Sequence, residues 1–400
     1  MSQPCLSKKN CQACGNNPTP HFPAWLAETA QVFLNPLDRI IIRGWVYSLL
    51  SRLAHKFFIG SIYVLKLFGV AKPNANITRV VCERGKVFWQ EAIRRGILMG
   101  NFIVCGRSVD VYQAVVRNKR IYFNGLPRPI RTDSGSELWL DDKELLKKKL
   151  QQADLPVARG GSFSRWDKIL EMFRQLDKPV IIKPRLGSRG RHTTTNVFTV
   201  EELKQAFKIA KQLCHWVIME EHLEGSVYRA TLINGKLAGL LRGDPPRVVG
   251  DGVHTIAELI DIKNKTRHHL VSEVIIDNQH LSFLSRRGWA LNSVPTGGEI
   301  IDLLEKIGVS YGGFRAEVIK ETHPEIKNVM EQAAAVVDDP LVGFDFIIKD
   351  VTIPPQGQKW GIIECNGTPF IDLHHEPLAG EPSNVARELW NYVEENVERF

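Results

Sequence analysis

Short apolar runs alternate with charged amphipathic stretches from residue 77 to the C-terminus. The segments 86–96 (KVFWQEAIRRG) and 141–156 (DDKELLKKKLQQADLP) have the apolar spacing of helices. The segments 77–83 (ITRVVCE), 101–106 (NFIVCG) and 178–184 (KPVIIKP) have the continuous apolar character of buried strands. This alternation predicts an α/β (α+β) fold in which helices cover a small parallel or mixed sheet.

Positive charge is concentrated in the first third of the chain. Residues 1–132 hold 19 Lys and Arg against five Asp and Glu, whereas the other residues hold 33 against 39. With 400 residues, 44% of them hydrophobic, the chain is long enough for two or three globular domains. The distribution disfavours a nucleic-acid binder, because the body is slightly acidic and no basic motif with stacking aromatic residues indicates RNA. It favours a basic front module on a nearly neutral body.

Residues 37–70 combine apolar and aromatic side chains with five basic residues, Arg39, Arg43, Arg52, Lys56 and Lys66. No window supplies the roughly 20 uncharged residues that a membrane-spanning helix needs. The spacing is typical of a helix that lies in the interface of an anionic membrane. A helical hairpin packed on the body of the protein, or on a second subunit of a homo-oligomer, is the alternative.

The N-terminus (MSQPCLSKKN) is polar, and the first 36 residues contain Cys5, Cys11 and Cys14. We expect a loose leader here, and its polarity excludes a signal peptide. An odd total of seven cysteines favours a reducing, cytoplasmic location, which for a membrane-associated protein would be the inner face of the membrane. The three thiols could bind a structural metal ion with His21 as a fourth ligand, or they could be free thiols in a mobile tail.

Two strands near the C-terminus carry acidic and amide side chains. Glu364 and Asn366 lie two residues apart in KWGIIECNG, so they project from the same face of a strand. If this strand pairs with VGFDFIIKD, Asp345 can lie beside them. Two carboxylates and an amide oxygen suit Mg²⁺ bridging the phosphates of a nucleotide. Polar residues on a solvated sheet face are the alternative.

The segment VIIKPRLGSRGRHTT ends a strand with Lys183 and continues into a loop with Gly187, Ser188 and Gly190. Glycines let backbone N–H groups approach phosphate closely, and a lysine can reach the same oxygens. The order of residues differs from that of a Walker A loop, and an ordinary basic turn would also explain it.

A third segment, CHWVIMEEHLEG, reads as a strand that ends at Glu220 and Glu221 and turns through Leu223 and Glu224. Such a hinge can offer backbone groups to a purine edge, and Glu220 can accept a hydrogen bond from the purine amino group.

In this order the three segments resemble the ATP-grasp superfamily. The stretches 241–267 (LRGDPPRVVGDGVHTIAELIDIKNKTR) and 309–337 (VSYGGFRAEVIKETHPEIKNVMEQAAAVV) are similar to cyanophycin synthetases and fused bacterial glutathione synthetases. The resemblance covers about residues 140–390. It implies an ATP-grasp domain at 141–400 that holds the nucleotide between two lobes, 141–220 and 221–400. We expect a small α/β domain at 71–140 and the leader and helical segment at 1–70 to precede it.

The resemblance also implies roles for individual residues. Lys143 and Lys183 correspond to the lysines that reach the nucleotide, and Glu220 and Leu223 to the adenine hinge. Asp345, Glu364 and Asn366 correspond to the ligands of one or two Mg²⁺ ions, with Mn²⁺ as an alternative. Arg242 corresponds to the family's arginine and would stabilise a tetrahedral oxyanion.

The chain departs from the family pattern at several positions. Val227 replaces the acidic residue that commonly holds the ribose, which makes Glu224 a candidate for that contact. Ser310, Tyr311 and Ala316 alter the segment associated with the amino-acid substrate. Because the chain ends at Phe400, we expect no Mur-ligase-like half and therefore no polymerase that adds two amino acids in turn.

The activity implied is ATP-dependent carboxylate–amine ligation through an acyl phosphate, on an amino acid or a peptide. The loop 187–195 should then close over ATP, because acyl phosphates hydrolyse when water is admitted. Two alternatives remain. One is a nucleotide-binding regulator or scaffold without ligase activity, suggested by Val227 and the altered 310–316 segment. The other is a phosphotransferase that stops at phosphorylation.

Overall fold

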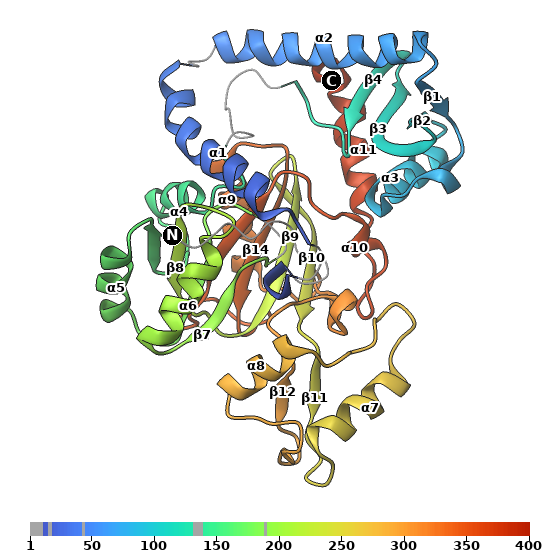
Figure 1. Ribbon diagram of the computed structural model, residues 1–400. Coiled ribbons are helices and arrows are strands. Elements are labelled where there is room, and N and C mark those ends of the chain that lie inside the picture. Colours follow the sequence, from blue (N-terminus) through green and yellow to red (C-terminus); the bar gives the residue numbers. More distant parts are fainter. Residues whose placement is uncertain (1–10, 15–17, 42–44, 131–138, 188–189) are drawn as a thin grey trace.

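The computed structural model describes residues 11–14, 18–41, 45–130, 139–187 and 190–400 (Figure 1). The α-helices of these residues are α1 (His21–Ile41), α2 (Trp45–Leu67), α3 (Glu83–Arg94), α4 (Lys143–Gln152), α5 (Trp166–Gln175), α6 (Val200–Ala210), α7 (Ile256–Thr266), α8 (Asn278–Arg286), α9 (Pro324–Val337), α10 (Asp372–His375) and α11 (Val385–Glu395). The strands form four sheets and are β1 (Ala71–Asn74), β2 (Leu98–Val104), β3 (Arg107–Val116), β4 (Lys119–Asn124), β5 (Gly160–Phe163), β6 (Val180–Pro184), β7 (Thr194–Val197), β8 (Val217–Glu221), β9 (Ser226–Ile233), β10 (Lys236–Asp244), β11 (Arg247–Val249), β12 (Ile300–Asp302), β13 (Phe314–Glu317), β14 (Leu341–Ile348) and β15 (Gly361–Asn366).

The front unit is an antiparallel sheet in the order β1-β2-β3-β4. The expectation of a parallel or mixed sheet here is wrong. Cys105-Gly106 and Arg117-Asn118 join the strands through residues with positive φ, and such two-residue turns make antiparallel hairpins. The strand expected at 77–83 is also wrong. The short helix η2 (Ile77–Arg79) stands there, and α3 begins at Glu83.

The C-terminal helix α11 completes the core of the front unit. The indole of Trp390 stacks on Phe88 of α3 with ring centroids 4.2 Å apart, and its Nε1 donates to the Phe88 carbonyl at 2.9 Å. One hydrophobic cluster contains Phe88, Tyr112 and Phe123 together with Leu389 and Trp390. The front unit and the C-terminal helix therefore share one core.

The central sheet has the order β13-β10-β9-β14-β15 and is antiparallel throughout. Helices α4 and α9 pack on one of its faces, where Leu146 and Met330 join Phe344 and Phe346 in a buried cluster. A second antiparallel sheet, β5-β8-β6-β7, has its own core with helices α5 and α6. These two units bring the three predicted nucleotide segments together.

A small subdomain is inserted between β10 and β13. It consists of β11, β12, α7 and α8 around a separate hydrophobic cluster, and it lies at the opposite end of the molecule from α2 (Figure 1). Its helix α7 begins with a capping box between Thr255 and Glu258.

The expectation of a loose leader is wrong for residues 21–36, which belong to α1. Val32 packs with Leu186 and Cys214 of the β5–β8 lobe, and the Thr29 hydroxyl accepts from the His215 N–H at 3.1 Å. Helix α2 buries Ile62 against the front sheet. Among the described residues, the structure contains no helix long and apolar enough to cross a membrane.

Candidate active site

Two of the predicted metal ligands lie side by side on neighbouring strands. Asp345 of β14 is paired directly with Glu364 of β15. Directly paired residues of antiparallel strands project to the same face, so the two carboxylates share one side of the sheet. Asn366 lies two residues after Glu364, opposite Gly343. The strand pairing that the sequence predicts for this region is confirmed.

Arg229 of β9 is a site residue that the sequence analysis did not single out. It is the cross-strand partner of Asp345, and its Nε and terminal nitrogen bind the two carboxylate oxygens at 2.8 and 2.7 Å. Burial alone would lower the pKa of Arg229, but the paired Asp345 raises it, so the guanidinium is charged. An arginine in the middle of an otherwise apolar strand (SVYRATLI) is the signal that could have identified it.

Lys143 connects the carboxylates to the glycine loop. It is the first residue of α4, whose N-terminus is capped by Asp142. Its Nζ donates to the Gly187 carbonyl at 2.7 Å and lies 3.8 Å from Oε1 of Glu364. Asp142 also binds the Arg185 guanidinium through both oxygens at 2.8 Å, which ties the start of α4 to the segment after β6.

The chemistry of the carboxylate pair fits a cation. Burial raises the pKa of Glu364, and the neighbouring charge of Asp345 raises it further, while Lys143 opposes both effects. A carboxyl group in this position is more stable as an anion when additional positive charge is present. The oxygen donors of Asp345, Glu364 and Asn366 are those that Mg²⁺ prefers.

Lys183 forms a buried ion triad with Glu220 and Lys147. Its Nζ lies 2.7 Å from Oε2 of Glu220, and Lys147 of α4 binds the other oxygen. Burial would raise the pKa of Glu220, but the two lysines lower it to about 2. Burial lowers the pKa of Lys183, and Glu220 opposes that shift. Accepting from a purine amino group would require Glu220 to release one of the lysines.

The rest of the hinge is fixed by contacts with β5 and with the loop before β15. Glu221 accepts from the Arg159 N–H at 2.8 Å, and its other oxygen lies 3.0 Å from Nζ of Lys359. Leu223 is buried and Glu224 is exposed. Gly225 has φ 122°, and a Cβ there would lie 2.2 Å from the Ile348 carbonyl oxygen, so only glycine fits.

The glycine loop follows β6. Gly187 and Gly190 have φ values of 107° and 62°, a region that favours glycine. Ser188 lies outside the described residues.

Arg242 lies apart from the carboxylates. It pairs across the strands with Tyr228, whereas Asp345 pairs with Arg229, so the register directs Arg242 to the opposite face of the sheet. Its Nε lies 2.9 Å from Asp244 and donates to the Ser226 hydroxyl at 3.1 Å.

The chain is similar to two groups of curated proteins. Cyanophycin synthetase of Synechocystis sp. is 32% identical over 254 residues, which is 61% of this chain and 29% of that protein. The glutathione biosynthesis bifunctional protein GshAB of Listeria monocytogenes is 29% identical over 317 residues, which is 77% of this chain and 41% of that protein. The chain therefore spans less than half the length of these relatives. No family model matches it.

A solved structure, the bifunctional glutathione synthetase of Pasteurella multocida, superimposes with a TM-score of 0.52 and 23% identity. The match covers 78% of this chain and 43% of that protein. The chain therefore shares the fold of this bifunctional glutathione synthetase. The resemblance to cyanophycin synthetase and to the fused glutathione synthetases is thereby confirmed.

Proposed function

We propose that this chain is an ATP-dependent ligase that joins a carboxylate to an amine through an acyl phosphate, with an amino acid or peptide among its substrates. The meeting of Asp345 and Glu364 with Lys143 carries the proposal, because it combines oxygen ligands for a cation with a cation for phosphate. The names of the relatives, cyanophycin synthetase and glutathione biosynthesis bifunctional protein, support an amide-forming reaction.

ATP would lie between the β5–β8 lobe and the central sheet. Glu221, Leu223 and Glu224 would form the adenine and ribose contacts, with Glu224 in the role that Val227 cannot perform. Gly187, Ser188 and Gly190 would offer backbone N–H groups to the phosphates. Asp345, Glu364 and Asn366 would hold one or two Mg²⁺ ions, and the same oxygen donors would accept Mn²⁺. When bound there, the metal would neutralise charge on the phosphates.

The reaction would proceed in two steps. A substrate carboxylate oxygen attacks the γ-phosphorus, the bond to the bridging oxygen breaks, and ADP leaves with an acyl phosphate formed. The amine nitrogen then attacks the acyl carbon, the bond from that carbon to the phosphate oxygen breaks, and the proton lost by nitrogen passes to phosphate or water. Lys143 and Lys183 would bind phosphate oxygens throughout, and an arginine would stabilise the tetrahedral oxyanion. Loop 187–195 would exclude water.

The test is amine-dependent formation of ADP across a panel of amino acids and short peptides, with intact-mass detection of the amide. We expect ADP and amide in equal amounts for at least one acid–amine pair. Tight ATP binding without ADP from any pair would favour the nucleotide-binding regulator. ADP with a stable phosphorylated product and no amide would favour the phosphotransferase.

We also propose that different parts of the chain have different functions. Residues 141–400 would form the catalytic ATP-grasp domain, with its nucleotide between 141–220 and 221–400. Residues 1–70 and the small domain 71–140 would determine where the enzyme works, in the cytoplasm at the inner face of an anionic membrane. Nucleic acid is disfavoured as a partner by the acidic charge balance of the body.

The exposed side chains at the outer face of α2 support the proposal that the protein binds a membrane surface. Phe57 and Leu67 of α2 are 79% and 83% exposed, and Phe68, directly after the helix, is 75% exposed, whereas Ile62 is buried against the front sheet. An apolar exposed face next to the exposed Lys56 suits an interface rich in anionic lipid.

Flotation with vesicles of mixed anionic and zwitterionic lipid at low salt tests this proposal. We expect the full chain to float and the variant with Phe57→Glu and Phe68→Glu to remain at the bottom. Val81→Glu, which changes an exposed apolar residue outside α2, is the matched control. Absence of flotation together with a dimer in mass photometry that the same double variant dissociates would instead assign the face to a second subunit.

A further inference from the structure

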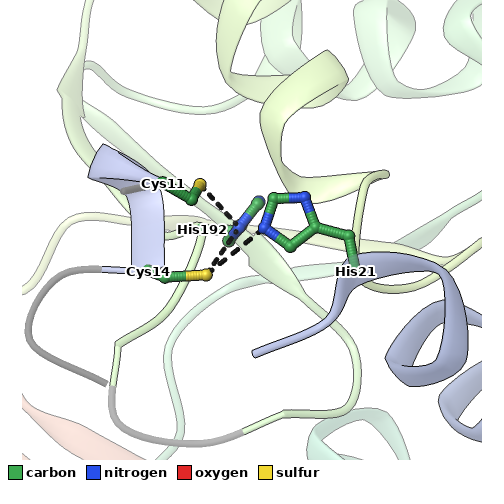
Figure 2. Close-up of side chains that lie close together, drawn as sticks. All are labelled: Cys11, Cys14, His21 and His192. Atoms are coloured by element: carbon green, nitrogen blue, oxygen red, sulfur yellow. Dashed lines mark hydrogen bonds between the residues drawn. The ribbon is translucent and has the colours of Figure 1, made fainter. Parts of the chain in front are cut away.

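Four potential metal ligands converge where the N-terminal segment meets the glycine loop. Cys14 is the last residue of the short helix η1 (Gln12–Cys14), and Cys11 directly precedes that helix. His21 is the first residue of α1, and His192 lies two residues after Gly190 (Figure 2). Their ligand atoms all lie within 4.8 Å of one another. Sequence reasoning named Cys5, Cys11, Cys14 and His21. The sequence does not indicate His192, because this residue is at least 171 positions away from the others along the chain. Only the tertiary fold brings it to the cluster. Cys5 lies outside the described residues.

The spacing of these atoms matches a tetrahedral site. Nε2 of His192 lies 3.7 Å from the Cys11 sulfur and 3.4 Å from the Cys14 sulfur, and Nε2 of His21 lies 3.4 Å from the Cys14 sulfur. In a tetrahedral zinc site with ordinary Zn–S and Zn–N bonds, neighbouring ligand atoms are about 3.3–3.8 Å apart. These three separations fall within that range.

His192 is oriented for this role by contacts outside the cluster. Its Nδ1 lies 2.8 Å from the Ile209 carbonyl oxygen, so Nδ1 donates and the lone pair of Nε2 is directed toward the thiols. The ring is completely buried, which excludes a surface histidine that turns freely.

The backbone of His192 is held in an uncommon conformation. It has φ 53°, which non-glycine residues adopt rarely, and its N–H donates to the Ala13 carbonyl at 2.9 Å. The loop is therefore joined to η1 through the main chain at the same point where the side chains meet.

We propose that Cys11, Cys14, His21 and His192 form a zinc site that fastens the N-terminal segment to the glycine loop of the ATP-grasp domain. Two thiolates and two imidazoles in tetrahedral geometry select zinc over the oxygen-seeking Mg²⁺. Binding converts two thiols to thiolates and releases two protons, which gives a site with no net charge. The inference concerns a metal separate from the carboxylate pair and does not depend on the ligase activity.

The site has a structural consequence for the loop. With Cys14 and His192 buried and all four positions taken by protein ligands, the ion would have no open position for a substrate. It would instead fix the position of Gly190 and of the residues after it. The position of this loop relative to Lys143 would then depend on the bound ion. Bound zinc should slow tryptic cleavage after Arg185 and Arg191 at least several-fold.

The test is the zinc content of the full chain, purified without a histidine tag or chelator, measured by inductively coupled plasma mass spectrometry. We expect about one zinc per chain, and at least a tenfold lower content in Cys14→Ser and in His192→Gln. Cys105→Ser and His269→Gln, which alter an exposed thiol and an exposed imidazole elsewhere, are the matched controls and should retain zinc.

Replacement of zinc by Co²⁺ reports the geometry directly. Wild type should show the visible bands of tetrahedral Co²⁺ and a thiolate charge-transfer band, and both should vanish in His192→Gln. Because Cys14→Ser could fail to fold, Cys11→Ser at the partly exposed edge of the cluster is a second variant. Three results would overturn the proposal: wild type without zinc or cobalt bands, full zinc content in His192→Gln, or a Cys11–Cys14 disulfide in freshly isolated protein.

Discussion

Asp345 and Glu364 lie directly opposite each other on β14 and β15 and present two carboxylates to the same face of the central sheet. Burial and this like-charge neighbour raise the pKa of Glu364, so a cation bound beside it would stabilise its charged form.

Glu364→Gln should slow ligation strongly and yet stabilise the magnesium-free protein. Because the folded state raises the pKa of Glu364 above its ordinary value of 4.5, the native protein binds this proton more tightly than the unfolded chain. The free energy of unfolding therefore falls as the pH rises through the raised pKa of Glu364, and glutamine removes this cost at neutral pH. We expect kcat/KM to fall about 10²–10³-fold. Melting curves at pH 5 and 7.5, with and without Mg²⁺, test this. Equal stabilisation of both proteins by Mg²⁺ would exclude Glu364 as a ligand.

Glu220→Gln should destabilise the protein strongly, because it leaves Lys147 and Lys183 buried without their carboxylate. The expected loss in the free energy of unfolding is about 3–5 kcal/mol. Because the pKa of Glu220 is lowered to about 2, its carboxylate contributes fully to the free energy of unfolding at pH values above its ordinary pKa. This contribution is lost as the pH falls toward 2. Urea unfolding between pH 3 and 7 measures both effects. Glu171→Gln breaks an exposed pair in the same lobe and should cost less than about 1 kcal/mol. A similar loss in both variants would contradict the triad.

Arg229→Met should lower kcat/KM about 10²–10³-fold, because the guanidinium fixes Asp345 through two hydrogen bonds. Arg242→Met tests the role expected of Arg242 from sequence. Its guanidinium lies on the opposite face of the sheet, so we expect a smaller loss. Steady-state kinetics for ATP compare the two variants, with circular dichroism to verify folding. The reverse order of effects would restore Arg242 as the residue that stabilises the oxyanion.

Trp390→Ala should destabilise the front unit by about 3–5 kcal/mol, although position 390 is almost 270 residues away from β4 along the chain. The reason is that the indole stacks on Phe88 and closes the shared core. Thermal unfolding measures the loss, and Leu98→Ala, at a side chain 75% exposed in the same unit, should change little. A small effect at Trp390 would mean that the front unit folds without the C-terminal helix.

The carboxylate strands could be predicted from sequence because their chemistry is local. Alternation along β15 directs Glu364 and Asn366 to one face, and two adjacent apolar strands predict the pairing that brings in Asp345. Lys183 at the end of an apolar strand and the Glu220–Glu221 strand end could be recognised in the same way.

Contacts that depend on the tertiary register could not be read from the sequence. The pairing of β9 with β14 brings Arg229 to Asp345 and turns Arg242 away, and no local pattern fixes that register. The convergence of His192 with Cys14 depends on how α1 docks on the β5–β8 lobe. The antiparallel pairing of the front sheet could not be predicted from its turns, because Arg117-Asn118 contains no glycine and therefore lacks the usual sequence signal of a tight hairpin.

The transfer of oxygen from the acid to phosphate tests the ligase account most directly. With a substrate carboxylate labelled with ¹⁸O, attack on the γ-phosphorus leaves one labelled oxygen in the inorganic phosphate that is released when the amine attacks. We predict one ¹⁸O per phosphate, formed only in the presence of the amine and lost with Glu364→Gln. Release of unlabelled phosphate together with the amide product would contradict an acyl phosphate and with it the proposed reaction.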